Sequence, residues 1–172
     1  MASLTPNSTA LMNSHMYDFV DLRKCIKGPP SYCKGSLMDI INSNPDFSRF
    51  AYIIKLARLD TVFNDIQANF TVFVPSNCYI KNISEGVFTN LDISSARQIV
   101  LASTLKYRMT SDILKDSPAS YFITMNPINS MFITNMNNIT YISNCISIIH
   151  YDIEATNGII HVTDQMLWPY FT

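Results

Sequence analysis

Residues 71–77 read TVFVPSN, and residues 157–169 read NGIIHVTDQMLWP. The first stretch predicts a strand, because β-branched and aromatic residues favour extended backbone and Pro75 ends the pattern. Ser76 or Asn77 can then accept backbone N–H groups and begin a short helical segment. These two stretches restrict the fold more than any other part of the chain does.

Side chains of the first strand alternate between two faces. Val72 and Val74 point to one face, and Thr71 and Phe73 point to the other. We expect this alternation in the folded strand.

The second stretch predicts a tight turn followed by another strand. Asn157 and Gly158 form a dipeptide typical of hairpin turns, in which we expect left-handed backbone. His161 then alternates with apolar neighbours, and its ring is expected to bond a hydroxyl or backbone group of residues 71–77. We prefer this structural histidine to a catalytic one. Asp164 is expected to cap the turn that follows the strand.

Helical patterns precede the strand patterns along the chain. Ser36, Asp46 and Asp92 each stand where a polar side chain can cap the start of a helix. Beyond Pro118, short segments rich in Ile, Thr, Tyr and Phe predict strands separated by hairpin turns. The chain is therefore predicted to have an α+β fold, a wedge of antiparallel strands packed by helices from the N-terminal half.

The two stretches, together with this order of elements, resemble the two signature motifs of the fasciclin-type domain. That domain is a secreted or surface-displayed adhesion module. The resemblance covers roughly residues 36–169 and implies the fasciclin topology for a domain at residues 36–172, behind an N-terminal extension at residues 1–35. The motif and structural residues are Thr71, Phe73, Pro75, Ser76, Asn77, Tyr107, Asn157, Gly158, His161 and Asp164.

Tyr107 and Arg108 stand where fasciclin-type domains commonly carry a Tyr-His pair. In some animal members this region is linked to integrin binding. Because arginine replaces histidine here, we interpret Tyr107 as a packing residue and not as a receptor contact.

The composition favours association and disfavours several function classes. Hydrophobic residues make up 48% of the chain and charged residues 15%, with a formal net charge of −1. Nucleic acid is a poor partner for such a chain, because phosphate binding needs clustered Lys and Arg. The three histidines lack metal-ligand spacing, and four glycines do not form a phosphate loop. We expect a protein without enzymatic activity, metal or cofactor.

Cysteines and asparagines offer modification sites whose use depends on the compartment. Cys25 and Cys33 flank a Gly-Pro-Pro turn and could form a local disulfide, although four reduced thiols are an equal alternative. Sequons that would carry glycans only if the chain is exported are Asn7, Asn69, Asn82 and Asn138.

Two settings remain open for a non-enzymatic protein that joins other proteins. The start of the sequence shows no secretory leader, and no run of apolar residues is long enough to span a membrane. This slightly favours a virion or intracellular assembly. Because fasciclin-like proteins occur in large DNA viruses, the resemblance implies a minor capsid or glue component of such a virus, which binds capsid subunits or further copies of itself. The alternative is a secreted or cell-surface adhesion domain whose leader has been removed.

Overall fold

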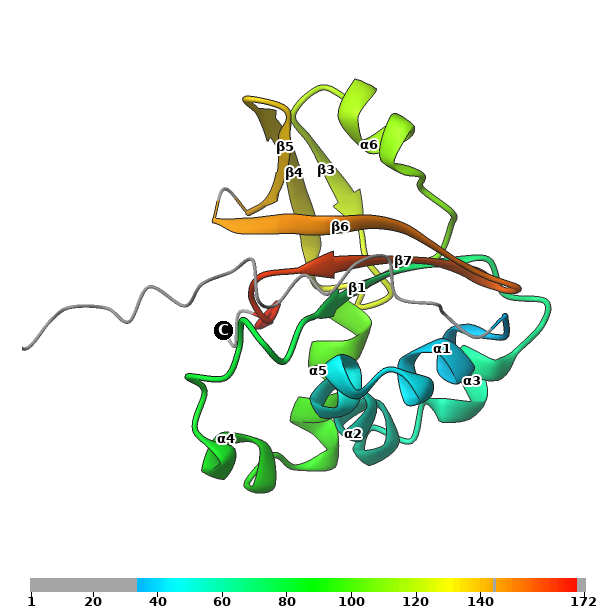
Figure 1. The fold of residues 1–172 in the computed structure, drawn as a ribbon, viewed down its shortest axis with the longest axis vertical. Coiled ribbons are helices and arrows are strands. Elements are labelled where there is room, and N and C mark those ends of the chain that lie inside the picture. The colour runs from blue at the N-terminus through cyan, green and yellow to red at the C-terminus, as the bar shows by residue number, and fades with distance from the viewer. Residues whose placement is uncertain (1–33, 144, 170–172) are drawn as a thin grey trace, which may run out of the picture. The chain divides into compact units, whose positions relative to one another are not determined.

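Most helices lie in the first half of the described chain and most strands in the second half (Figure 1). The computed structural model describes residues 34–143 and 145–169. The helical segments are α1 (Leu37–Ser43), the 3-10 turn η2 (Pro45–Phe47), α2 (Ser48–Leu56), α3 (Asp60–Asn64), α4 (Glu85–Thr89), α5 (Ile93–Ala102) and α6 (Ser111–Asp116). The strands are β1 (Phe70–Pro75), β2 (Thr104–Leu105), β3 (Ser120–Ile123), β4 (Ser130–Met136), β5 (Ile139–Ile142), β6 (Ile146–Ala155) and β7 (Gly158–Thr163). The predicted α+β class is confirmed.

All described residues belong to one unit, Ser31–Thr172. The predicted extension at residues 1–35 lies almost entirely outside the described residues, so its boundary stays a prediction. None of the helices in the described ranges is long and apolar enough to cross a bilayer.

Two of the predicted helix caps are confirmed. Ser36 and Asp39 form a capping box at the start of α1, where the Ser36 Oγ accepts from the Asp39 N–H at 3.1 Å and the Asp39 carboxylate accepts from the Ser36 N–H at 2.8 Å. The hydrogen bonds between Ser36 and the Asp39 carboxylate lower the pKa of Asp39. Asp92 caps α5, because its Oδ1 accepts from the Ser95 N–H at 2.7 Å.

The predicted cap at Asp46 is wrong. Pro45, whose fixed backbone angle suits the first helical position, begins the turn η2 one residue earlier, and Asn44 caps it. The helix α2 then starts at Ser48 without a cap from the preceding residue. The Asp46 carboxylate instead accepts hydrogen bonds from residues that follow β1.

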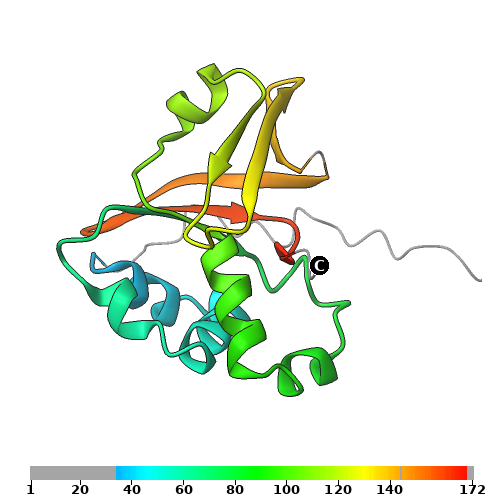
Figure 2. The ribbon, with the colours of Figure 1, turned by 180° about the vertical axis from the view of Figure 1, so that it is seen from behind.

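The seven strands of the described chain form a sheet in the order β2-β1-β7-β6-β5-β4-β3. Neighbouring strands are antiparallel except β1 and β7, which run parallel. The sheet curls so that its two ends meet, since Leu105 of β2 bridges Thr124 just beyond β3. Figures 1 and 2 show α1 to α5 on one side of β1 and β7, and β3 to β5 on the other.

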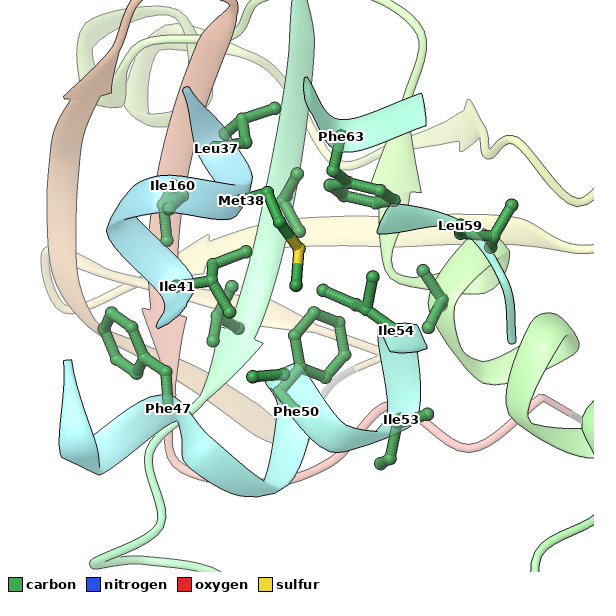
Figure 3. Close-up of a cluster of buried hydrophobic side chains, with 14 of the residues drawn as sticks. Leu37, Met38, Ile41, Phe47, Phe50, Ile53, Ile54, Leu59, Phe63 and Ile160 are labelled. Atoms are coloured by element: carbon green, nitrogen blue, oxygen red, sulfur yellow. The ribbon is translucent and has the colours of Figure 1, made fainter. Parts of the chain in front are cut away.

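Two hydrophobic clusters pack against opposite faces of β1. Val72 and Val74 belong to the larger cluster with the buried side chains of α1, α2, α3 and α5, part of which is seen in Figure 3. Phe73 belongs to the smaller cluster, which is formed by side chains of β2, β4, β5 and β6 with Leu114 of α6. The alternation predicted for the first strand is therefore confirmed. Full burial of each large apolar side chain contributes roughly 1.5–3 kcal/mol, so β1 is anchored from both sides.

Candidate functional site

The two sequence stretches meet in the sheet as the neighbouring strands β1 and β7. β1 and β7 lie side by side over their whole length, from the pair Phe70 and Gly158 to the pair Pro75 and Thr163. We call residues 70–77 and 157–164 together the motif junction. Nearly all motif and structural residues expected from the sequence lie in it, and Tyr107 contacts it through its backbone.

His161 is fully buried and its two ring nitrogens are both engaged. Nδ1 accepts from the Asp152 N–H at 3.3 Å, and Nε2 lies 2.8 Å from the Met109 carbonyl oxygen. This pair of partners places the ring proton on Nε2. The predicted bond to residues 71–77 is not formed, because the residue opposite His161 in the register is Phe73, whose ring lies 5.6 Å away and has no polar group.

Burial lowers the pKa of His161, with the Arg108 charge acting in the same direction. The Met109 carbonyl and the Asp152 carboxylate oppose this shift without reversing it. The ring is therefore neutral at pH 7 and has no free nitrogen with which to move a proton.

Thr71 fastens the segment after β2 to the junction. Its Oγ1 donates to the Tyr107 carbonyl oxygen at 2.7 Å and accepts from the Met109 N–H at 2.8 Å. The Tyr107 ring is partly exposed, and burial of the remainder raises the pKa of its phenol. Tyr107 thus reaches the junction through its backbone, while its ring faces outward.

Ser76 and Asn77 do not begin a helix after β1. The Ser76 Oγ donates to Asp46 Oδ2 at 2.5 Å. Asn77 Oδ1 accepts from the Arg49 N–H at 3.3 Å, and its Nδ2 donates to Ser48 Oγ at 2.7 Å. The two residues therefore supply, from across the chain, the polar contacts that the start of α2 lacks locally.

The side chain of Asn157 is buried and joins three elements. Its Oδ1 accepts from the Leu37 N–H at the start of α1 at 2.7 Å. Its Nδ2 donates to the carbonyl oxygens of Phe63 and Asp65, each at 2.9 Å, at the end of α3. Asn157 therefore attaches the tip of the β6–β7 hairpin to two helices.

The left-handed backbone predicted at Asn157 and Gly158 is wrong, because neither residue has a positive φ. Gly158 is required for a close approach of two strands instead. A Cβ atom at this position would lie 2.3 Å from the Phe70 carbonyl oxygen. Left-handed residues occur at the β4–β5 hairpin, where Asn137 and Asn138 have φ values of 52° and 64°.

Arg108 bridges the junction to β6. Its Nη1 donates to the Gly158 carbonyl oxygen at 2.8 Å, and its Nη2 forms an ion pair with Glu154. Asp152, at a bulge in β6 with φ of 58°, accepts from the Ser111 N–H at 2.8 Å and so caps α6. Sequence reasoning missed both roles, because each partner lies more than forty positions away.

Asp164 does not cap the turn after β7. Its Oδ1 accepts from the Ser147 N–H at 2.9 Å, which ties the end of β7 to β6. Burial raises the pKa of this carboxyl, and the bonds from Ser147 partly oppose the shift. Asp164 also lines an open pocket of about 220 Å³, together with Tyr79 and Trp168.

The polar side chains of the junction hold neighbouring segments of the chain together. Across residues 34–143 and 145–169, every buried polar side-chain atom has a hydrogen-bond partner. The same residues hold no group of three or more His, Cys, Asp or Glu side chains placed to bind a metal ion. The side-chain hydrogen bonds of the junction hold backbone segments in place relative to one another.

The modification sites divide between described and undescribed parts of the chain. Cys25, Cys33 and Asn7 lie outside the described residues. Cys78 is disulfide-bonded, whereas Cys145 is a free and exposed thiol. The other sequon asparagines are all exposed, namely Asn69, Asn82 and Asn138.

Comparison with known proteins identifies relatives of this chain. The fasciclin domain model matches residues 45–169. Over 143 residues the chain is 27% identical to the rabbit (Oryctolagus cuniculus) transforming growth factor-beta-induced protein ig-h3, covering 82% of the chain and 20% of that protein. Over 137 residues it is 26% identical to the pig (Sus scrofa) protein of the same name, covering 78% and 19%. The chain thus spans about a fifth of these curated relatives.

A solved structure shares the fold. It is a FAS1 domain pair from the insect cell adhesion molecule Fasciclin I, with a TM-score of 0.67 and 21% sequence identity. The match covers 78% of this chain and 51% of the insect chain. The helices and curled sheet described above are therefore an arrangement already seen in that domain pair.

Proposed function

Because the chain belongs to the fasciclin domain family, we propose that it is a non-enzymatic adhesion domain that acts outside the cell. Domains of this family mediate adhesion and protein interaction. The observation that carries the proposal is the match of residues 45–169 to the fasciclin domain. The hydrogen bonds of the motif junction are consistent with it, since they leave no buried polar side-chain atom of the described residues without a partner.

Two features support the extracellular setting. Cys78 is disulfide-bonded, and disulfides persist mainly in oxidising compartments. Asn69, Asn82 and Asn138 are exposed and can accept glycans without disturbing the core.

The relatives named above include a cell adhesion molecule and no virion protein. The capsid role expected from the sequence gains no support from them.

Cell attachment tests the adhesion role. Mammalian and insect cells are plated on surfaces coated with the full chain, because the relatives come from mammals and an insect. The control surface carries the same chain after reduction, alkylation and heating, which destroys the fold but keeps the composition. Attachment above the control is expected. Equal attachment to both surfaces would overturn the adhesion proposal.

The intact mass of the protein from its natural source tests the setting. Thiols are alkylated before and after reduction, so that closed disulfides are counted. Glycan mass together with a closed disulfide at Cys78 is expected. An unglycosylated chain with four free thiols would contradict export and return the search for partners to intracellular assemblies.

A further inference from the structure

The strands β3, β4 and β5 have one face that turns away from both hydrophobic clusters. On the inner face, Met131 and Ile133 of β4 and Ile142 of β5 are buried in the smaller cluster. On the other face, Tyr121 pairs with Phe132 and Met136 pairs with Ile139 across neighbouring strands. We call this second face the outer face.

Large apolar side chains are exposed on the outer face. Tyr121 and Ile123 are each 73% exposed, Met136 is 55% exposed and Ile139 is 40% exposed. The Tyr121 and Phe132 rings lie 4.8 Å apart and extend the apolar surface from β3 to β4. In Figures 1 and 2 these strands stand on the side of β1 and β7 opposite to α1 to α5.

The outer face also lacks charge. Residues 117–151 contain no Asp, Glu, Lys or Arg. An uncharged apolar face of this kind can be buried against another protein without removing a charge from water.

The area of the outer face fits a protein interface. If a fully exposed large side chain presents roughly 200 Å², the four most exposed side chains supply roughly 500 Å² of apolar surface. A standard interface buries about 800 Å² on each partner, of which just over half, roughly 450 Å², is apolar. The outer face meets this requirement.

We propose that the outer face of β3–β5 binds the same face of a second copy of this chain, forming a two-fold symmetric dimer. A partner with a charged surface would lose water from its charges without gaining an opposite charge here. A second copy presents an uncharged apolar surface, so neither side buries a charge, and a two-fold axis makes one patch complementary to itself. This inference rests on the proposed adhesion role in one respect, because it names a second copy of the chain as a partner of the adhesion domain.

Sedimentation velocity of the full chain tests the dimer. Over concentrations from about 1 μM to about 100 μM, the mass is expected to rise from 19.5 kDa to twice that value. Ile123→Lys and Met136→Lys introduce a charge at two separate points of the outer face. Each is expected to weaken the dimer at least tenfold, because a charge buried in an apolar interface has no partner.

Ile66→Lys is the matched control, because Ile66 is 75% exposed and lies between α3 and β1. It should leave the dimer unchanged. Thermal unfolding checks each variant, and two variants ensure that one remains usable if the other fails to fold.

Two results would overturn the dimer: a single 19.5 kDa species at every concentration, or equal weakening by Ile66→Lys and Ile123→Lys. The attachment assay separates this proposal from the adhesion role. A monomer that still supports cell attachment overturns the dimer alone, and a dimer that supports none overturns adhesion alone.

Discussion

Replacing Asn157 by alanine tests whether one buried amide holds the hairpin tip to the helices. The Leu37 N–H would lose its 2.7 Å partner at a buried helix start, which costs about 1–3 kcal/mol. The Phe63 carbonyl oxygen would lose a 2.9 Å bond, worth about 1 kcal/mol. The Asp65 carbonyl oxygen loses less, because it also accepts from the Ala68 N–H. We therefore expect the free energy of unfolding to fall by roughly 3 kcal/mol.

Urea unfolding of the full chain with its disulfide intact measures this loss, and thermal unfolding should show a Tm lower by roughly 10 °C. Asn90→Ala is the matched control, since Asn90 is exposed, and it should change the free energy by less than about 0.5 kcal/mol. Asn157→Asp keeps the acceptor for Leu37 but sets a carboxylate against two carbonyl oxygens, so at neutral pH it should be at least as destabilising as alanine. A loss below about 1 kcal/mol for Asn157→Ala, or a tolerated Asn157→Asp, would refute the reasoning.

Four further predictions concern His161 and Gly158 of the same junction and Arg108, which contacts it. His161→Ala should lower the Tm, and an unchanged Tm would exclude its structural role. Burial lowers the pKa of His161 in the folded chain, so below about pH 6.5 the unfolded chain binds more protons and wild-type stability decreases as the pH is lowered. Urea unfolding at pH 7.5 and 5.5 should show a smaller decrease for His161→Gln than for the wild type. An equal decrease in both proteins would contradict this prediction. Gly158→Ala should cost at least about 2 kcal/mol in urea unfolding, because its Cβ would lie 2.3 Å from the Phe70 carbonyl oxygen; a neutral substitution would show that the two strands can separate. Arg108→Met should cost about 1 kcal/mol through the lost bond to the Gly158 carbonyl oxygen, whereas the neighbouring Lys106→Met, at an exposed position, should cost nothing measurable.

Features that depend on residues three or four positions apart could be predicted from the sequence. Ser36 and Asp92 cap their helices because each side chain reaches a backbone N–H three residues later. The alternation of Val72 and Val74 against Phe73 follows from strand geometry wherever the strand lies. The order of helices and strands could be predicted for the same reason, whereas the family came from the resemblance of residues 71–77 and 157–169 to its two signature motifs.

Features of the candidate site that join distant residues could not be predicted. Asp46, a plausible cap in the sequence, binds Ser76 and Cys78, which are thirty or more positions away. The capping of α6 by Asp152 is equally remote, and no local signal predicted that helix.

The sequence by itself therefore determined the α+β class, because strand alternation and helix caps are local properties of the backbone, and the resemblance of its two motifs added the fasciclin-type topology. Only the tertiary structure decided what His161, Asn157 and Gly158 do. Their contacts with Met109, Leu37 and Phe70 cross the chain. Such contacts exist only once β1 and β7 lie side by side. A hydrogen bond needs its two atoms within about 3 Å of each other in space, and the spacing of residues along the sequence does not show which distant residues come that close.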